Sequence, residues 1–109
     1  MAKQLKFTYK AIDYTLEFSR KVIEDMERAG FIADDITTKP ATTLPALFAG
    51  AFRMHHKHMK RELIDEIYSH MTKKDELIGK LAEMYNEALE VLLLEPEDDD
   101  EGNVEWTMV

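Results

Sequence analysis

The strongest constraint on the fold is a change of hydrophobic period near Ser19. Before it, residues 3–18 alternate between apolar and polar side chains, and many of the apolar ones are aromatic or β-branched. A period of two with these residue types predicts two strands, each with one face in solvent. The turn between them must fall at residues 10–13, and no Asn-Gly or Asp-Gly pair there specifies its type. A lone hairpin is marginal in water, so its apolar face must pack on the helices predicted after it.

After Ser19 the apolar residues recur at helical spacing. Ser19 is a favourable N-cap and Gly30 a favourable C′ residue, which bounds a first helix. Residues 31–43 are polar and rich in turn formers, so we expect a loop there. Thr43 is then expected to cap a second helix with Pro45 in its first turn, and residues 60–70 and 74–94 predict a third and a fourth that Pro96 ends.

These patterns predict an α+β fold that is mostly α, with an N-terminal β-hairpin packed on about four helices. Residues 1–94 form a single domain in this interpretation, and residues 95–109 form a flexible acidic C-terminal tail. The apolar stripes of the second to fourth helices are the expected core. They comprise Leu44, Leu47, Phe48, Ala51 and Phe52, then Leu63, Ile64, Ile67, Tyr68 and Met71, then Leu77, Ile78, Leu81, Met84, Tyr85, Ala88, Leu89, Leu92 and Leu93.

The negative charge is concentrated in the tail. Residues 95–109 contain seven acidic residues and no Lys or Arg, and the whole chain has a net charge of −8, which leaves −1 for residues 1–94. A nearly neutral body does not suit general binding to a phosphate backbone, so we expect no nucleic-acid partner. The longest apolar run, residues 91–94, is too short to span a membrane, and we expect no membrane partner.

The chain has no cysteine, which excludes disulfides, thiolate metal sites and cysteine nucleophiles. No apolar run follows the first residues, so we expect no signal peptide and a cytoplasmic location. A phosphate-binding glycine loop and a nucleophile-elbow motif are both missing from the sequence. We therefore expect a protein that is not an enzyme and that uses no cofactor.

The cluster His55-His56-Lys57-His58 lies between the second and third predicted helices. His55 and His58 share one face if the helix continues, and Glu62 or Asp65 is the candidate further ligand of a metal site. The spacing lacks the pattern of a known zinc motif, so we favour a polar helix end whose imidazoles face solvent or the last carbonyl groups.

A dense basic patch surrounds these histidines. It consists of Arg53, Lys57, Lys60 and Arg61. Nucleic acid is one possible partner of such a patch. Because the body has little net charge, neutralisation by the acidic tail of the same chain or of a neighbouring copy is the simpler interpretation.

The order of elements resembles a known family. The residues that carry the resemblance are the strands 6–9 and 14–18, the helix 19–27, Gly30-Phe31, the segment 43–52 followed by His55-His56, the segment 84–87, and the acidic tail ending in Val104-Glu105-Trp106. Together they are similar to small phage and prophage proteins of Gram-positive hosts that resemble the tail assembly chaperones of long-tailed phages.

The resemblance implies a function. Such chaperones bind the tape measure protein, recruit tail tube subunits as the tail grows, and are absent from the mature virion; several also have a longer form made by frameshifting. A homo-oligomer is implied as well. The seven methionines include several within or beside the apolar stripes, and Met packs adaptably at binding surfaces. The candidate protein-binding residues are Leu47, Phe48, Phe52, Met54, Met59, Met84 and Tyr85.

Two other functions remain open on the sequence alone. The acidic tail suits an inhibitor encoded by a phage that mimics DNA or occupies a basic host protein. The histidine cluster suits a metal-dependent enzyme, which we consider the weaker alternative.

Overall fold

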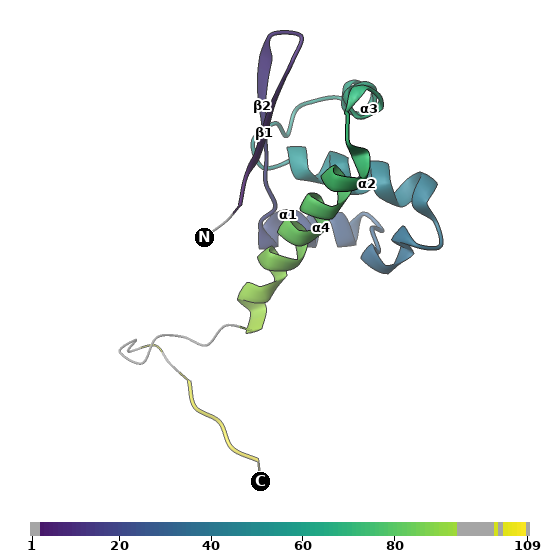
Figure 1. Ribbon diagram of the computed structural model, residues 1–109. Coiled ribbons are helices and arrows are strands. Elements are labelled where there is room, and N and C mark those ends of the chain that lie inside the picture. The colour runs from purple at the N-terminus through teal and green to yellow at the C-terminus, as the bar shows by residue number, and fades with distance from the viewer. Residues whose placement is uncertain (1–2, 94–101, 103, 109) are drawn as a thin grey trace.

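The computed structural model describes residues 3–93, 102 and 104–108. The chain begins with two antiparallel strands, β1 (Leu5–Tyr9) and β2 (Ile12–Leu16), and continues through the helices α1 (Arg20–Arg28), η1 (Ala33–Ile36), α2 (Pro40–Phe52), α3 (Arg61–His70), α4 (Lys74–Glu90) and η2 (Val91–Leu93). Figure 1 shows the hairpin standing beside the helices, with its turn pointing away from the end of α4. The predicted α+β, mostly α fold is confirmed.

The hairpin closes through a two-residue turn. Tyr9 pairs with Ile12, so that Lys10 and Ala11 form the turn, and both have positive φ angles, 49° and 65°. Two positive φ angles define a type I′ turn, whose twist matches that of the flanking strands. The turn lies within the predicted range.

Helix α1 begins and ends where its sequence predicts. The Ser19 side chain accepts a hydrogen bond of 3.2 Å from the Val22 N–H, as an N-cap residue does. Gly30 follows the helix with a φ of 101°, a conformation that residues with a Cβ rarely adopt. Local chemistry therefore accounts for both ends of the helix.

Helix α2 departs from the prediction. It starts at Pro40 rather than after Thr43, and η1 occupies part of the expected loop. Proline suits the first helical position because its φ is fixed near the helical value and its missing N–H would have no partner there. Pro45 consequently lies inside the helix, and Thr43 is a buried helical residue rather than a cap.

The core is a single cluster built around α2. Phe48, Ala51 and Phe52 have no exposed surface, and the Phe48 and Phe52 ring centroids lie 5.0 Å apart. The other buried apolar residues are Tyr14, Leu16, Phe18, Val22, Ile23, Met26, Leu47, Ile64, Ile67, Leu77, Leu81, Met84 and Tyr85. Each large side chain contributes on the order of 1.5–3 kcal/mol by leaving water, so the hairpin and helices depend on one another for stability.

Helix α4 ends before its predicted limit. It stops at Glu90 and tightens into η2, where Leu92 and Leu93 are 54% and 87% exposed. Their place in the predicted core stripe is therefore wrong, and so is that of Leu63 in α3, which is 39% exposed. Leu94 and the acidic residues 95–101 lie outside the described residues. None of the helices in the described part combines the length and hydrophobicity needed to cross a lipid bilayer.

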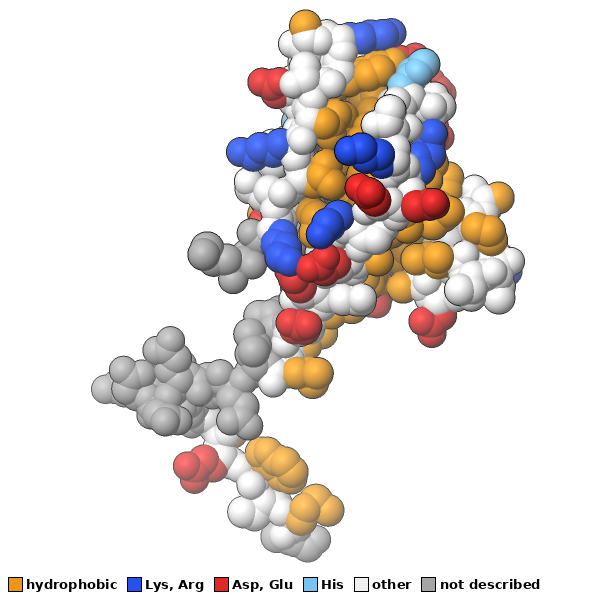
Figure 2. All heavy atoms as spheres, viewed as in Figure 1, with side chains coloured by type: hydrophobic (Ala, Val, Ile, Leu, Met, Phe, Trp, Pro, Cys, Tyr) orange, Lys and Arg blue, Asp and Glu red, His pale blue; other side chains and the backbone are white. Residues whose placement is uncertain are grey.

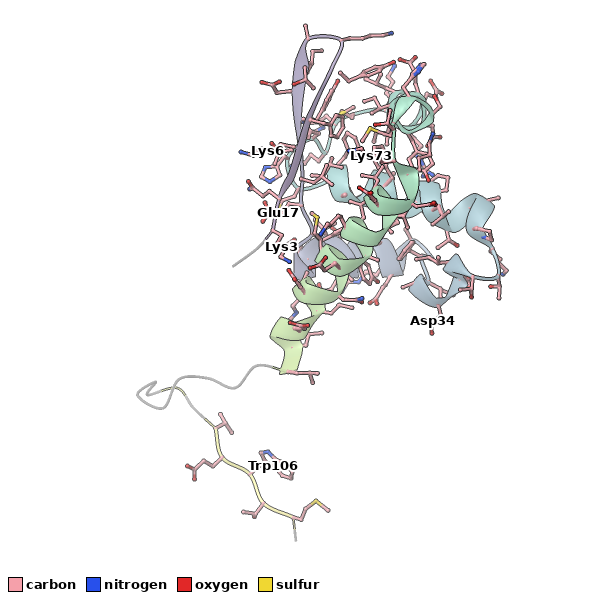
Figure 3. The ribbon with its side chains drawn as sticks, viewed as in Figure 1. Lys3, Lys6, Glu17, Asp34, Lys73 and Trp106 are labelled. Atoms are coloured by element: carbon pink, nitrogen blue, oxygen red, sulfur yellow. The ribbon has the colours of Figure 1, made fainter. Side chains whose placement is uncertain are left out.

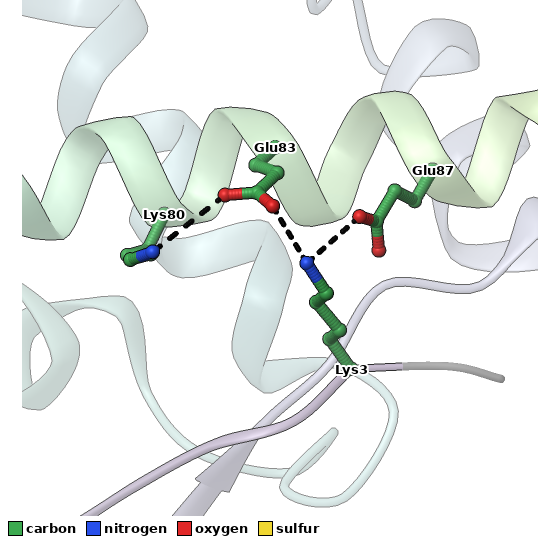
Figure 4. Close-up of polar contacts among 4 residues, drawn as sticks. All are labelled: Lys3, Lys80, Glu83 and Glu87. Atoms are coloured by element: carbon green, nitrogen blue, oxygen red, sulfur yellow. Dashed lines mark hydrogen bonds and ion pairs between the residues drawn. The ribbon is translucent and has the colours of Figure 1, made fainter.

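The start of the chain is fastened to α4 by charge. The Lys3 ammonium lies 2.6 Å from a Glu83 carboxylate oxygen and 2.9 Å from one of Glu87 (Figure 4). These hydrogen bonds raise the pKa of Lys3 above its ordinary value. All three side chains are partly or well exposed, so the interaction adds little stability. It does place the residues before β1 beside the last turns of α4.

Candidate functional site

An open groove of about 460 Å³ lies between α1, η1 and α2 and reaches the segment that follows α2. Small residues of α2 line it, namely Ala46, Ala49 and Gly50, together with the partly buried Phe31 and Met59. The exposed Ile32 lines it as well. The groove therefore offers an apolar surface that an amphipathic segment can cover.

Gly50 brings α1 close to α2. A Cβ at this position would lie 2.5 Å from Met26 Cε and 3.2 Å from Met26 Cγ, so the Met26 side chain occupies the space that a larger residue would need. The cost of a glycine inside a helix is offset by this close packing. The contact sets the separation of the two helices that line the groove.

Charges of both signs surround the apolar lining. Asp25 and Asp35 supply the negative charges, and Arg53, Lys57 and Arg61 supply the positive charges. Arg53 Nη2 lies 3.7 Å from an oxygen of Asp25. A groove with an apolar floor and a mixed charged rim has the composition of a protein-binding surface rather than of a phosphate site.

His55 is bound to the buried carboxylate of Glu17. Its Nε2 lies 2.8 Å from Glu17 Oε1, and Gln4 donates a second hydrogen bond of 2.9 Å to the same oxygen. The hydrogen bonds from His55 and then from Gln4 hold the pKa of Glu17 below its ordinary value. The segment after α2 is thus joined to the end of the hairpin by this hydrogen-bonded pair.

His56 covers the outer edge of β2. Its Nε2 accepts a hydrogen bond of 3.0 Å from the Thr15 backbone N–H, which requires this nitrogen to be unprotonated. Burial, and then the neighbouring His55, lower the pKa of His56. The expected placement of the imidazoles in solvent or against the last carbonyl groups of the helix is therefore wrong for His56, whereas His55 is exposed and also pairs with Glu17.

The candidate metal site does not form. Within residues 3–93 and the described remainder, no three His, Asp or Glu side chains are arranged to hold a metal ion. His55 is paired with Glu17, so the proposed set with His58 and Glu62 is not brought together.

The basic patch is partly neutralised by its own domain. Arg61 pairs with Asp65 at 3.0 Å, and Arg53 lies near Asp25. Lys57 and Lys60 form no ion pair within the described residues. The tail that was expected to neutralise this patch lies largely outside the described residues.

The candidate protein-binding residues separate into two groups. Five of them are core residues with exposed fractions of 0–6%, namely Leu47, Phe48, Phe52, Met84 and Tyr85. Side chains packed this deeply stabilise the fold and present almost no surface to a partner. The prediction that these five residues contact a partner is therefore corrected. Met54 is 46% exposed and Met59 lines the groove, so these two remain accessible. The groove residue Ile32 was missed, since a single Ile in a polar loop has no distinctive pattern.

The fold and the groove define a class: a small hairpin-and-helices domain with an open, mixed apolar and charged surface. Within that class the chain belongs to a family described as a domain of unknown function, DUF5055, whose profile matches residues 1–109. No curated protein and no solved structure matches the chain.

Proposed function

We propose that this protein is a tail assembly chaperone of a long-tailed phage and that it is not an enzyme. It binds amphipathic helices of the tape measure protein in the groove between α1, η1 and α2, and it recruits tail tube subunits. The groove is the observation that carries the proposal, because its floor is apolar and its rim holds both Asp25 and Arg53. The order of hairpin and helices, which resembles that of such chaperones, supports it.

The chemistry of the partner follows from the groove. Coiled-coil-prone helices present an apolar stripe flanked by charged residues of both signs. The small side chains of Ala46 and Ala49 admit the stripe, and the rim charges face the flanking residues. In this proposal the chaperone acts in the host cytoplasm, forms homo-oligomers and is left out of the mature virion.

Co-expression with the tape measure protein of the same gene cluster tests the proposal. The chaperone should raise the soluble yield of the tape measure protein and be purified with it. Ala46→Trp fills the groove and should abolish both effects. Ala41→Trp is the matched control, because Ala41 is an exposed residue of the same helix outside the groove lining. Equal behaviour of the two variants, with both folded by circular dichroism, would count against the groove.

A second candidate function rests on the acidic residues 95–109. The seven negative charges there suit an inhibitor of a basic host protein or a mimic of DNA. Deletion of residues 95–109 separates the two functions. Inhibitor binding requires these residues, whereas a chaperone lacking them should still fold and retain the tape measure protein.

A further inference from the structure

The edge of the hairpin on the β2 side is partly covered, and the β1 edge is open. The Thr15 N–H of β2 bonds to His56, and the N–H of Glu17, which follows β2, bonds to the Ala51 carbonyl at 3.0 Å. Since the Thr15 N–H points away from β1, its partner Lys6 belongs to a pair without hydrogen bonds between the strands, and so does Thr8, two residues further along. The N–H and C=O groups of Lys6 and Thr8 therefore point outward from β1.

These outward groups have no backbone partner among the described residues. The side chains beside them are also incompletely covered, since Leu5, Phe7 and Tyr9 are only half-buried. Figure 2 shows a strip of hydrophobic side chains at the surface between the hairpin and helices α3 and α4. An open strand edge next to apolar side chains is a template for one more strand.

The segment 104–108 has the pattern of such a strand. Its apolar residues Val104, Trp106 and Met108 alternate with Glu105 and Thr107. The three apolar side chains are 79–86% exposed, and Trp106 lies apart from the folded body (Figure 3). Large apolar side chains on one face of an extended segment gain free energy when that face is covered.

We propose that residues 104–108 of the same chain dock on the open edge of β1 as a third strand, parallel to β1. In this register Val104 lies beside Leu5, Glu105 beside Lys6, Trp106 beside Phe7, Thr107 beside Thr8 and Met108 beside Tyr9. The two segments then match residue for residue in chemistry: aliphatic with aliphatic, acid with base, aromatic with aromatic, hydroxyl with hydroxyl, and methionine with tyrosine.

The direction of the docked strand follows from the position of the end of α4, from which the chain continues to residue 104. The Lys3 contacts place the beginning of β1 beside Glu83 and Glu87, near the end of α4. Leu93 comes six positions after Glu87, a helical rise of about 9–12 Å. Residues 94–103 span up to about 33 Å when extended, which is enough to return to the first residues of β1. A strand that enters there and follows the edge runs in the same direction as β1.

Charge favours the same register. Lys6 points outward from the hairpin (Figure 3) and forms no ion pair within the described residues. Glu105 would stand beside it on the solvent face. An antiparallel strand would instead place Glu105 beside Thr8. The tethered segment has a high effective concentration at this edge, which favours its own chain over a second copy. The inference does not depend on the proposed function.

Fluorescence of Trp106, the single tryptophan, tests the docking in the full chain. Its acrylamide quenching constant should be about half that of a peptide of residues 102–109, or lower, when at least half of the molecules are docked. Lys6→Glu should raise the constant towards the peptide value, and Lys6→Glu with Glu105→Lys should lower it again. Lys57→Glu is the control in the basic patch and should have no effect. A wild-type constant equal to that of the peptide, or a response to Lys57→Glu alone, would overturn the proposal.

A disulfide tests the register and the origin of the strand, because the chain has no other cysteine. Thr8→Cys with Thr107→Cys should oxidise within one chain about tenfold faster than Thr8→Cys with Met108→Cys, whose thiols would face opposite sides of the sheet. Equal rates would overturn the register. A product that is mainly a cross-linked dimer would show that the strand comes from a second copy and would overturn docking within the chain.

Discussion

Replacing Ala11 by glycine should stabilise the protein. Ala11 has a φ of 65° in the hairpin turn, where the Cβ of an L-residue crowds the following carbonyl at a cost of about 1–2 kcal/mol. Ala11 is exposed, so the loss of its methyl group removes no packing. Glycine gives back about 0.4–1 kcal/mol through the greater freedom of the unfolded chain. The net gain is about 0.5–1 kcal/mol, which corresponds to a rise in Tm of about 3–6 °C for a domain of this size.

Urea unfolding followed by circular dichroism, together with calorimetry, measures this gain. Ala82→Gly is the matched control, because it makes the same chemical change inside α4 and should destabilise by about 1 kcal/mol. The urea m-value should stay constant in both variants. If Ala11→Gly lowers the midpoint, or leaves it unchanged while Ala82→Gly behaves as expected, the turn is not strained at Ala11 and the reasoning fails.

Three further substitutions test the packing and the histidine contact. Gly50→Ala should destabilise by about 1 kcal/mol, because crowding of Met26 outweighs the helix preference for alanine. In a chain that already carries Met26→Ala, the same Gly50→Ala change should instead restore stability. Chemical unfolding of the single and double variants measures this coupling. The lowered pKa of His56 means that the unfolded chain binds more protons below pH 6.5, so stability should fall as the pH drops through that range. His56→Gln keeps an acceptor for the Thr15 N–H and should flatten this loss in urea melts from pH 7.5 to 5. Phe52→Ala should cost about 3–5 kcal/mol and lower the Tm whether or not a partner is present, whereas a residue that acted only in binding would leave the Tm of the free protein unchanged.

The elements that the sequence predicts well are those whose causes are local. The alternation before Ser19 specifies the strands, and the Ser19 and Gly30 caps bound α1. The beginning of α2 was missed because Thr43 and Pro40 both carry helix-start chemistry. Pro40 precedes Thr43 along the chain and is preorganised for the first helical position, a cue that the sequence does contain.

The histidine contacts could not be predicted because their partners are distant in sequence. His56 meets Thr15 across 41 positions, and His55 meets Glu17 across 38. Nothing in the local pattern of either segment specifies these pairs. The same limit applies to Leu92, which continues the helical stripe of α4 although no other described element lies there to cover it. Burial is decided by neighbouring elements, and periodicity alone does not reveal them.

Two basic surfaces of the domain could attract the acidic segment, and the pattern of its apolar residues distinguishes them. The patch with Lys57 and Lys60 offers charge but no outward strand edge, so it would attract the segment without ordering Trp106. The edge of β1 offers Lys6 together with outward backbone groups and half-buried apolar neighbours. Exposed ion pairs contribute little free energy to docking, and salt screens them. Strand pairing and apolar contact are not screened by salt. Raising the salt concentration should therefore release a segment held by the patch and leave one held by the edge largely in place.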